Sequence, residues 1–468
     1  MIMSLFERFH APDHRGLDII IVGCGTVGAT LVERLSNEGH DVTIIDKDRE
    51  RVNEIANYYD VMGLVGNGAR YGILMDAGIQ HCDVFIAVAE DDELNLLSCC
   101  IASKIGHCAT FARVHTPDYS SEIGYFRETL GLTMIINPEL STAEETARLL
   151  YQPNALEVIP FAHERAEMVK FKVYDNNPLI GKTIAEIGKE LPHELLIAVI
   201  ERDDEVIIPK GNDHIENGDQ VSFVSSKENV RKFFEYIGFD SRQVSDCMII
   251  GGGKSAYFLA TKLIEMGIDV KIIEQDRDRC ERLSVLLPQA IIIHGDGTSE
   301  ELLHEENIKH IESFIPLTGI DEENVLLSLH ALQVNEDVKV VTKINRVNYR
   351  DVIRGMDLGS VIYPRYIIAE TILSYVRGMM NSQGSNVETL YHMFNDRVEA
   401  VEFKITEDSP ITEVHLKDLK IKKNVLIASI NRKGKIIIPS GRDRIHVGDS
   451  VMIVSTNLGY DNIAQILA

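Results

Sequence analysis

The sequence predicts an α/β protein with two doubly wound parallel sheets in tandem, each followed by a small α+β domain. Three observations lead to this prediction. Short runs of β-branched residues alternate with segments of helical length, a glycine-rich turn follows the first run, and the whole pattern occurs twice. A chain of 468 residues is long enough for three or four domains, each with its own core.

Alternating strands and helices fill the first repeat, as a parallel doubly wound sheet requires. We expect strands at 18–22, 41–46, 61–65, 83–89, 110–114 and 133–136. We expect helices at 27–38 and 93–105, and two further helices that end near residues 58 and 77. A longer helix is expected from Ser141 to Gln152, with Ser141 and Thr142 as plausible N-caps. A matching helix follows residues 361–366 in the second repeat. Their apolar faces suit packing against another helix or a second subunit, which hints at dimerisation.

The first glycine turn, GCGTVG, has the Gly-x-Gly-x-x-Gly spacing of the Rossmann dinucleotide-binding fold. Such a turn lets a pyrophosphate approach the backbone N–H groups at the start of the next helix. Asp46 ends the second strand, where a carboxylate accepts hydrogen bonds from ribose hydroxyls and disfavours a 2′-phosphate. The predicted cofactor contacts are therefore Gly23, Cys24, Gly25, Thr26, Val27, Gly28 and Asp46. The alternative is a Rossmann sheet with a degenerate, empty site.

The second glycine cluster, GGGKSA, follows the strand CMII and superficially resembles a phosphate-binding P-loop. It is not one, because Met248 stands where a P-loop needs its first glycine. It fits the Rossmann pattern instead, and its distance to the acid Glu274 equals that between Gly23 and Asp46. The predicted contacts are Gly251, Gly253, Lys254, Ser255, Ala256 and Glu274.

Lys254 stands where the first repeat has Thr26, so it either meets a phosphate or is a solvated lysine on an exposed turn. Because of this cation, the second site can prefer a different, more charged nucleotide than the first.

Further candidates lie where the third and fifth strands of each repeat end, on the side that faces the ligand in such sheets. Asn67 and Asp296 occupy the loops GNG and GDG, and Arg113 and Lys343 lie near the ends of the fifth strands. The two cations either contact phosphate or form structural ion pairs. The acidic runs 90–93 and 321–323 open helices, where they either complement the helix dipole or bind a cation.

The small domains also match one another, residues 168–226 with 400–456. Their IIP-x-G and Gly-Asp elements are typical of turns between short strands, and nothing in these domains looks catalytic. The predicted domains are 17–150, 160–240, 245–378 and 389–468. The predicted linkers are 151–166, 227–245 and 379–388, of which the last is the most flexible by composition.

Charge and composition exclude several classes of function. A net charge of −25 argues against nucleic acid or anionic lipid as a partner. Without eighteen consecutive apolar residues or a signal peptide, we expect a cytosolic protein with no direct membrane insertion. The seven cysteines have no CxxC pair and suit a reducing compartment, and the sixteen histidines have no HExxH motif, so no metal site is predicted.

This duplicated order resembles the Trk-type potassium uptake regulators, the TrkA family of two tandem RCK (KTN) domains. The resemblance rests on GCGTVG with Asp46, the GNG loop, AVAEDDELNLL, their partners in the second repeat, and the modules containing IIPKGNDHIENGD or IIPSGRDRIHVGD. It covers the chain from Leu17 onward and makes each small domain an RCK C-terminal domain. Asn67 departs from the aspartate usual in the family, and GGGKSA lacks the third glycine.

The resemblance implies a cytoplasmic regulatory subunit, peripheral at the inner face of the cell membrane. It implies a homo-oligomeric, tetrameric ring beneath a TrkH-like membrane potassium-translocating subunit, which the ring gates as NAD(H), ATP or ADP binds. The competing class is an NAD-dependent oxidoreductase, which needs a proton donor and a substrate domain. Each Rossmann repeat is followed only by a small domain, and none of the fifteen tyrosines has a lysine four residues later, so a regulator is favoured over an enzyme.

Overall fold

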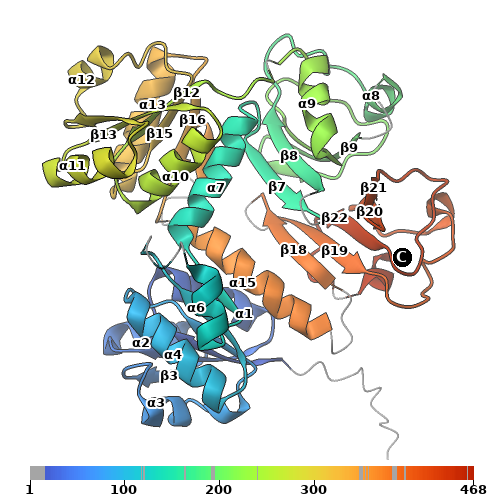
Figure 1. Ribbon diagram of the computed structural model, residues 1–468. Helices are drawn as coiled ribbons and strands as arrows, with labels where there is room; N and C mark the ends of the chain where they lie inside the picture. Colours follow the sequence, from blue (N-terminus) through green and yellow to red (C-terminus); the bar gives the residue numbers. More distant parts are fainter. Residues whose placement is uncertain are drawn as a thin grey trace, which may run out of the picture. The chain divides into compact units, whose positions relative to one another are not determined.

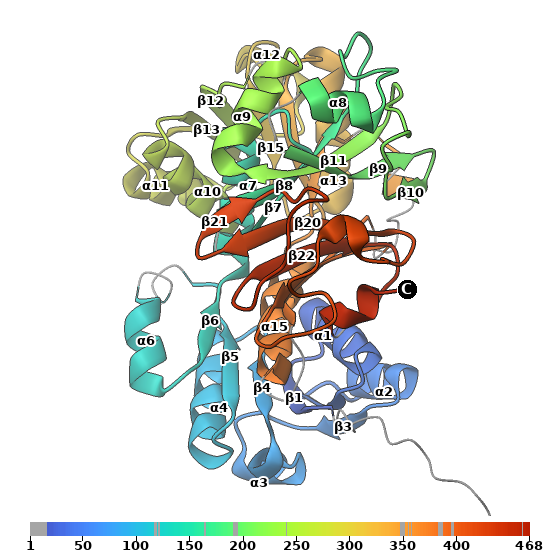
Figure 2. The ribbon, with the colours of Figure 1, turned by 90° about the vertical axis from the view of Figure 1, so that its right-hand side faces the viewer.

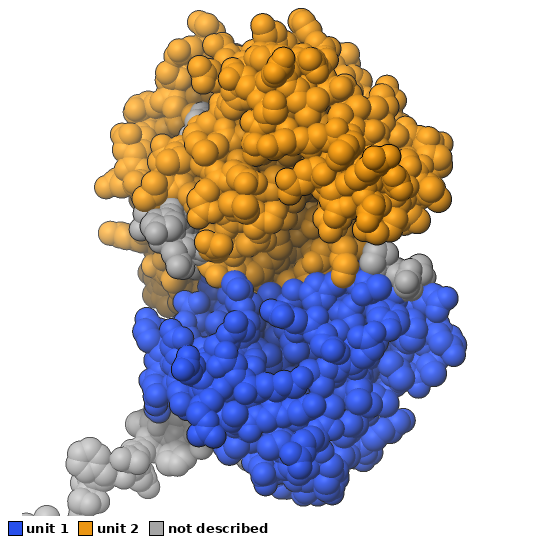
Figure 3. All heavy atoms as spheres, turned by 90° about the vertical axis from the view of Figure 1, so that its left-hand side faces the viewer, with its two compact units in different colours: residues 1–137, 371–384 blue, residues 138–370, 385–468 orange. Residues whose placement is uncertain are grey.

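The computed structural model describes residues 16–116, 119, 122–162, 165–190, 195–239, 241–346, 352–353, 355–356, 358–381, 387–394, 397–460 and 462–468. The chain forms two compact units (Figure 3). Unit 1 comprises Met1–Asn137 and Thr371–Gly384, and unit 2 comprises Pro138–Glu370 and Ser385–Ala468. Among the described residues, no helix combines the length and the apolarity needed to cross a membrane.

Unit 1 contains a six-stranded parallel sheet in the order β3-β2-β1-β4-β5-β6, the doubly wound arrangement that the sequence predicts. Its strands are β1 (Asp18–Val22), β2 (Asp41–Asp46), β3 (Met62–Val65), β4 (Val84–Ala87), β5 (Ala109–Arg113) and β6 (Met134–Ile136). Its helices are α1 (Thr26–Asn37), α2 (Arg49–Tyr59), α3 (Tyr71–Asp76), α4 (Asp92–Ile105) and α6 (Ile123–Leu130), with a short 3-10 turn at Ile79–His81. The strand order reverses between β1 and β4, which is where such sheets form a ligand crevice.

A helix from far along the chain completes unit 1. Helix α15 (Pro364–Asn381) contributes its residues from 371 onward to this unit. The ring of Tyr375 lies 5.0 Å from that of Phe111 on β5, and Arg377 forms an ion pair with Glu38 just after α1. The first sheet is thus covered in part by a helix that follows the second sheet in sequence.

Unit 2 contains the second parallel sheet, in the matching order β14-β13-β12-β15-β16-β17. Its strands are β12 (Asp246–Ile250), β13 (Asp269–Glu274), β14 (Ile291–His294), β15 (Ser313–Pro316), β16 (Lys339–Lys343) and β17 (Ser360–Ile362). Its helices are α10 (Lys254–Glu265), α11 (Arg277–Leu286), α12 (Glu300–Glu305) and α13 (Asp321–Val334). The prediction of two tandem doubly wound sheets is confirmed.

Helix α7 (Pro138–Tyr151) begins earlier than predicted, and the prediction of Ser141 and Thr142 as N-caps is wrong. Proline suits the first turn of a helix because the N–H that it lacks has no helical partner there. Thr142 lies inside the helix, where its hydroxyl donates to the carbonyl oxygen of Pro138 at 2.7 Å.

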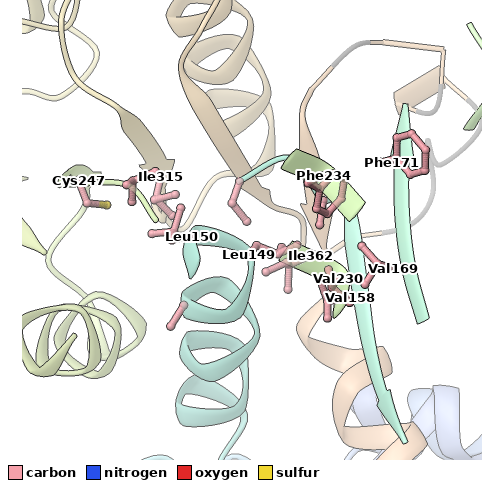
Figure 4. Close-up of a cluster of buried hydrophobic side chains, with 14 of the residues drawn as sticks. Leu149, Leu150, Val158, Val169, Phe171, Val230, Phe234, Cys247, Ile315 and Ile362 are labelled. Atoms are coloured by element: carbon pink, nitrogen blue, oxygen red, sulfur yellow. The ribbon is translucent and has the colours of Figure 1, made fainter. Parts of the chain in front are cut away.

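The apolar face of α7 packs against α10 of the same chain, so this face needs no second subunit to cover it. The contact belongs to a large apolar cluster around Leu149 and Leu150 (Figure 4). This cluster extends from the second parallel sheet, represented by Ile315 and Ile362, to the first antiparallel sheet, represented by Phe171.

Each small domain contains a five-stranded antiparallel sheet (Figure 2). The first has the order β10-β9-β11-β8-β7, with strands β7 (Glu157–Phe161), β8 (Ala166–Lys172), β9 (Leu195–Arg202), β10 (Glu205–Ile207) and β11 (Gln220–Ser226) and helices α8 (Ile184–Glu190) and α9 (Lys227–Tyr236). The second has the order β18-β19-β22-β20-β21, with β18 (Val387–Met393), β19 (Val398–Lys404), β20 (Val425–Arg432), β21 (Lys435–Ile437) and β22 (Ser450–Ser455) and 3-10 turns at Leu416–Asp418 and Ile463–Ile466. One apolar cluster joins Met168 and Val224 of the first sheet to Val398 and Met452 of the second.

Two of the predicted linkers contain ordered elements. The segment 151–166 contains β7, and 227–245 contains α9, whose Phe233 and Phe234 pack on Phe171. The segment 379–388 overlaps the end of α15 and the start of β18, while residues 382–386 lie outside the described residues. The predictions of linkers at 151–166 and 227–245 are wrong because composition does not reveal which polar segments carry one apolar face to a core.

The Gly-Asp elements of the small domains do more than turn the chain. Asp219 is buried and accepts two hydrogen bonds of 2.8 Å from the guanidinium of Arg202. Asp449 is held by Arg432 in the same way, at 2.9 and 2.8 Å. Paired bonds of this kind have a defined geometry, so each aspartate fixes its turn against the neighbouring strand.

Candidate nucleotide-binding sites

The first glycine turn lies where β1 ends and α1 begins. Gly23 has a φ of +105°, a conformation that favours glycine, and its N–H donates to the carbonyl oxygen of Ile45 at 2.9 Å. A Cβ atom on Gly28 would lie 1.9 Å from the carbonyl oxygen of Gly23. The helix therefore approaches the turn so closely that only glycine fits at its third position.

Helix α1 begins without a side-chain cap, because its N-cap residue is Gly25. The next helix, α2, is capped by the carboxylate of Asp48, which accepts from the N–H groups of Glu50 and Arg51. A Cβ on Gly25 would meet nothing within 4 Å, so open space lies beside this helix start. Uncapped N–H groups at the positive end of a helix form a binding site for a phosphate.

The carboxylate of Asp46 anchors this turn. One of its oxygens accepts from the N–H of Cys24 at 2.6 Å, and the other from the N–H of Asp48 at 2.9 Å. Each oxygen retains a lone pair that can accept from a ribose hydroxyl. Burial, and then the charge of Asp46, raises the pKa of the Cys24 thiol to about 12, so this cysteine stays neutral beside the acid.

The second glycine turn repeats this arrangement in unit 2. Gly251 has a φ of +95°, and Gly253 is the uncapped N-cap residue of α10. Glu274 accepts from the N–H of Gly252 at 2.6 Å and from that of Asp276 at 2.7 Å. Its longer side chain is only 6% exposed, whereas Asp46 is half-buried.

Two differences distinguish the second site. Ala256 is fully buried where the first site has Gly28, so α10 cannot approach its turn as closely as α1 does. Lys254 is exposed at the first residue of α10, with Ser255 beside it, where the first site has Thr26. Arg279 lies 3.8 Å from Glu274, but Arg51 occupies the same place in the first repeat, so Lys254 is the cation that the second site adds.

The GNG and GDG loops form matching turns after β3 and β14. Asn67 accepts from the N–H of Ala69 at 2.9 Å, and Asp296 accepts from the N–H and hydroxyl of Thr298 at 2.9 and 2.7 Å. The hydrogen bonds from Thr298 lower the pKa of Asp296. Asparagine and aspartate support the same turn, so the departure at Asn67 changes the charge of the loop rather than its hydrogen-bonded turn.

The cations near the ends of the fifth strands occupy equivalent places. Arg113 donates to the carbonyl oxygen of Val88 at 3.4 Å, and Lys343 donates to that of Leu317 at 3.3 Å. Burial lowers the pKa of Lys343, although the charges of Asp321 and Glu139 oppose this shift. Glu139 lies in the first turn of α7, so this helix brings an acid to the second crevice.

Two buried asparagines, which the sequence motifs did not single out, hold the loops that follow the fourth and fifth strands of each parallel sheet. The amide of Asn95 on α4 bonds the backbone N–H and carbonyl of Ala89 and the carbonyl of Arg113 at 2.8 to 2.9 Å. Asn324 on α13 does the same for Thr318 and Lys343 at 3.0 to 3.3 Å. The available signal was their identical position in DELNLL and DEENVLL.

The acidic runs at the starts of α4 and α13 are used within the protein. Asp91 caps α4 by accepting from the N–H of Leu94 at 2.6 Å. Asp92 accepts from the backbone and side chains of His115 and Thr116, at 2.7 to 3.1 Å. Burial alone would raise the pKa of Asp92, but these hydrogen bonds lower it overall. The matching Asp321 binds the backbone after β16, so both runs shape the crevice.

Two Rossmann sheets, each with an acid anchored to an uncapped glycine turn and each followed by an antiparallel sheet, define a protein of duplicated nucleotide-binding fold. The TrkA-N domain model matches residues 19–138 and 247–364, and the TrkA-C domain model matches 168–238 and 400–467. The chain belongs to the TrkA family of Trk system potassium uptake proteins.

Relatives and solved structures agree with this assignment. The Trk system potassium uptake protein TrkA of Halomonas elongata is 30% identical over 93% of this chain and 95% of its own. That of Vibrio alginolyticus is 31% identical over 96% and 98%. The GsuK RCK domain has a TM-score of 0.61 at 16% identity, covering 96% of this chain and 95% of its own. The GsuK channel bound to NAD has the same score and identity, covering 96% and 79%. These solved structures confirm the fold.

Proposed function

We propose that this chain is a regulatory subunit of a Trk-type potassium uptake system that binds nucleotides in both Rossmann crevices. The observation that carries the proposal is the paired geometry of an uncapped glycine turn and an anchored acid in each repeat. NAD(H) suits the first crevice, because Asp46 favours free ribose hydroxyls. ATP or ADP suits the second, because Lys254 adds positive charge where the first crevice has Thr26.

Different residues of each crevice would bind different parts of the nucleotide. The first-turn N–H groups of α1 and α10 bind phosphate, Asp46 and Glu274 orient the ribose, and Arg113 and Lys343 reach toward the phosphates from the fifth strands. A bound nucleotide supplies charge and hydrogen bonds that bridge these elements. None of these roles needs a proton donor or a hydride acceptor, so the proposal is a regulator rather than an oxidoreductase.

Regulation requires that a ligand bind one conformation better than another. Glu139 at the start of α7 interacts electrostatically with Lys343 in the second crevice. A phosphate drawn to Lys343 would compete with Glu139 and so favour a different position of α7. We propose that α7 transmits nucleotide binding in this way.

The remaining parts of the proposal concern assembly. A tetrameric ring of this chain would lie at the inner face of the cell membrane and gate a TrkH-like potassium-translocating subunit. The four domains would be 17–150, 160–240, 245–378 and 389–468. This part of the proposal is supported by the family to which the chain belongs, because its relatives are named Trk system potassium uptake proteins.

Substitution of either acid should remove binding at its own crevice. Losing the acceptor for ribose hydroxyls costs about 2–3 kcal/mol, or roughly 30- to 150-fold in affinity. We expect Asp46→Ala to weaken NADH binding and Glu274→Ala to weaken ATP or ADP binding. Calorimetric titration of each variant with NADH, NAD, ATP and ADP measures both effects.

Matched controls lie at the opposite ends of the same strands, where Asp41 and Asp269 are exposed. Asp41→Ala and Asp269→Ala should leave all four affinities unchanged. Unchanged binding after substitution of Asp46 and Glu274 would contradict the proposed sites. Oxidation of NADH by the pure protein when it is offered reducible metabolites would favour the oxidoreductase instead.

A further inference from the structure

Three metal-ligating side chains meet on the helices that flank the second parallel sheet. Helices α12 and α13 are labelled in Figure 1. Glu300 and His304 lie one turn apart on α12, and His330 lies on α13. One ligand atom from each lies within 4.8 Å of the others. In the part of the chain that the structure describes, no other group of three His, Cys, Asp or Glu residues meets this spacing.

Core packing holds the two helices in this arrangement. Leu303 and Ala331, the neighbours of the two histidines in sequence, are buried in one apolar cluster. The imidazole rings of His304 and His330 lie 6.2 Å apart at an interplanar angle of 79°. Nε2 of His330 is buried and has no hydrogen-bond partner among the described residues. A buried nitrogen of this kind calls for a partner, and a metal ion is one that imidazole binds well.

The fold itself does not require this cluster. Asp92 and Asp321 are equivalent in the two repeats and lie 229 residues apart, as do Asn95 and Asn324. At the same separation, the first repeat has Tyr71, Met75 and Ile101 in place of Glu300, His304 and His330. Aromatic and apolar side chains thus suffice at these positions. The three ligands are a property of the second repeat alone.

We propose that Glu300, His304 and His330 bind a divalent transition-metal ion, with Zn²⁺ as the expected occupant. Two imidazoles and one carboxylate form a ligand set that Zn²⁺ accepts, with water in the fourth position. Bonds of about 2 Å in a tetrahedral site place ligand atoms about 3.3 Å apart, so the present cluster must contract. The side chains of Glu300 and His304 are 74% and 37% exposed, so they are free to rotate toward His330.

Sequence spacing did not point to this site, because the third ligand comes from a separate helix 26 positions after His304. A bound ion would link α12 to α13, because side chains from both helices would coordinate it. It would also add stability to the second parallel sheet, because the ion binds the folded arrangement and not the separated helices.

The test is titration of the full-length chain with Zn²⁺ in competition with a chromophoric chelator. We expect one competing site in the wild type, with affinity lowered about tenfold or more by Glu300→Gln, His304→Ala or His330→Ala. Glu301→Gln and His310→Ala change exposed neighbours outside the cluster and should leave binding unchanged. Zn²⁺ should also raise the melting temperature of the wild type but not that of His304→Ala.

Glu300 and His304 are exposed, so their variants should fold even where His330→Ala does not. Co²⁺ spectroscopy identifies the donors, because thiolate ligands give intense charge-transfer bands and histidine ligands do not. Absence of binding in the wild type would overturn the proposal. So would thiolate bands, or zinc binding that all three variants retain.

Discussion

Replacement of Lys339 by methionine should remove a large pH dependence from the stability of the protein. Lys339 begins β16 and is only 8% exposed. Its ammonium group donates to Ser360 Oγ at 3.0 Å and to the carbonyl oxygen of Ala155, both uncharged. Burial therefore lowers the pKa of Lys339 from 10.5 to about 7.

The sign of the effect follows from proton binding. Between pH 7 and 10.5 the unfolded chain holds a proton on Lys339 that the folded chain releases, so the wild type gains stability as pH rises. Below pH 7 both states are protonated, and the full cost of burying the charge is present. From pH 6 to pH 10 the wild type should gain about 4 kcal/mol relative to Lys339→Met.

Urea unfolding of both proteins at a series of pH values measures this difference. The substitution also removes the two hydrogen bonds of the ammonium group. Their loss changes the free energy of unfolding of the variant by a similar amount at every pH, so it does not alter how the difference between the two proteins changes with pH. Lys309→Met removes an exposed lysine from the same parallel-sheet domain and serves as the control. If the difference in the free energy of unfolding between wild type and Lys339→Met stays constant from pH 6 to 10, the proposed cost of burying the charge is ruled out.

Removal of the Asn95 amide should destabilise the first parallel sheet by about 3 kcal/mol. Asn95 is fully buried, and its side chain bonds three backbone groups at the ends of β4 and β5. In Asn95→Ala these three part-buried groups lose their partner, at a cost of about 1 kcal/mol each. Asn324→Ala should have a similar effect on the second sheet, because its contacts are equivalent.

Calorimetric unfolding of each variant tests this prediction. Leu97→Ala changes a residue of α4 that is 53% exposed and should alter stability by less than about 0.5 kcal/mol. Equal losses for Asn95→Ala and Leu97→Ala would show that the buried amide contributes nothing beyond ordinary helix packing.

Local features of the sequence were sufficient to predict the parallel sheets and the pairing of each glycine turn with its acid. The strands from Asp18 to Val22 and from Asp41 to Asp46 have the predicted bounds, because β-branched runs and glycine turns act over a few residues. Spacing also placed the first glycine turn, through the N–H of Cys24, beside Asp46, since parallel strands bring their carboxyl ends to one edge of the sheet.

Features that depend on distant partners were missed or mistaken. The helix cap at Ser141 was wrong because Pro138 starts α7 earlier. The linker at 227–245 was wrong because Phe233 and Phe234 belong to a core that includes strands far away in sequence. The roles of Asp92 and Asn95 became visible only with the loops that they hold.

The sequence by itself determined the duplication, the two doubly wound sheets, and the pairing of each glycine turn with its acid, because short-range spacing encodes all three. Only the tertiary structure decided that α7 covers α10, that the end of α15 covers the first sheet, and that Lys339 loses its solvent. It alone brought His330 to Glu300 and His304. These outcomes depend on which apolar faces meet, and that depends on the packing of the whole chain.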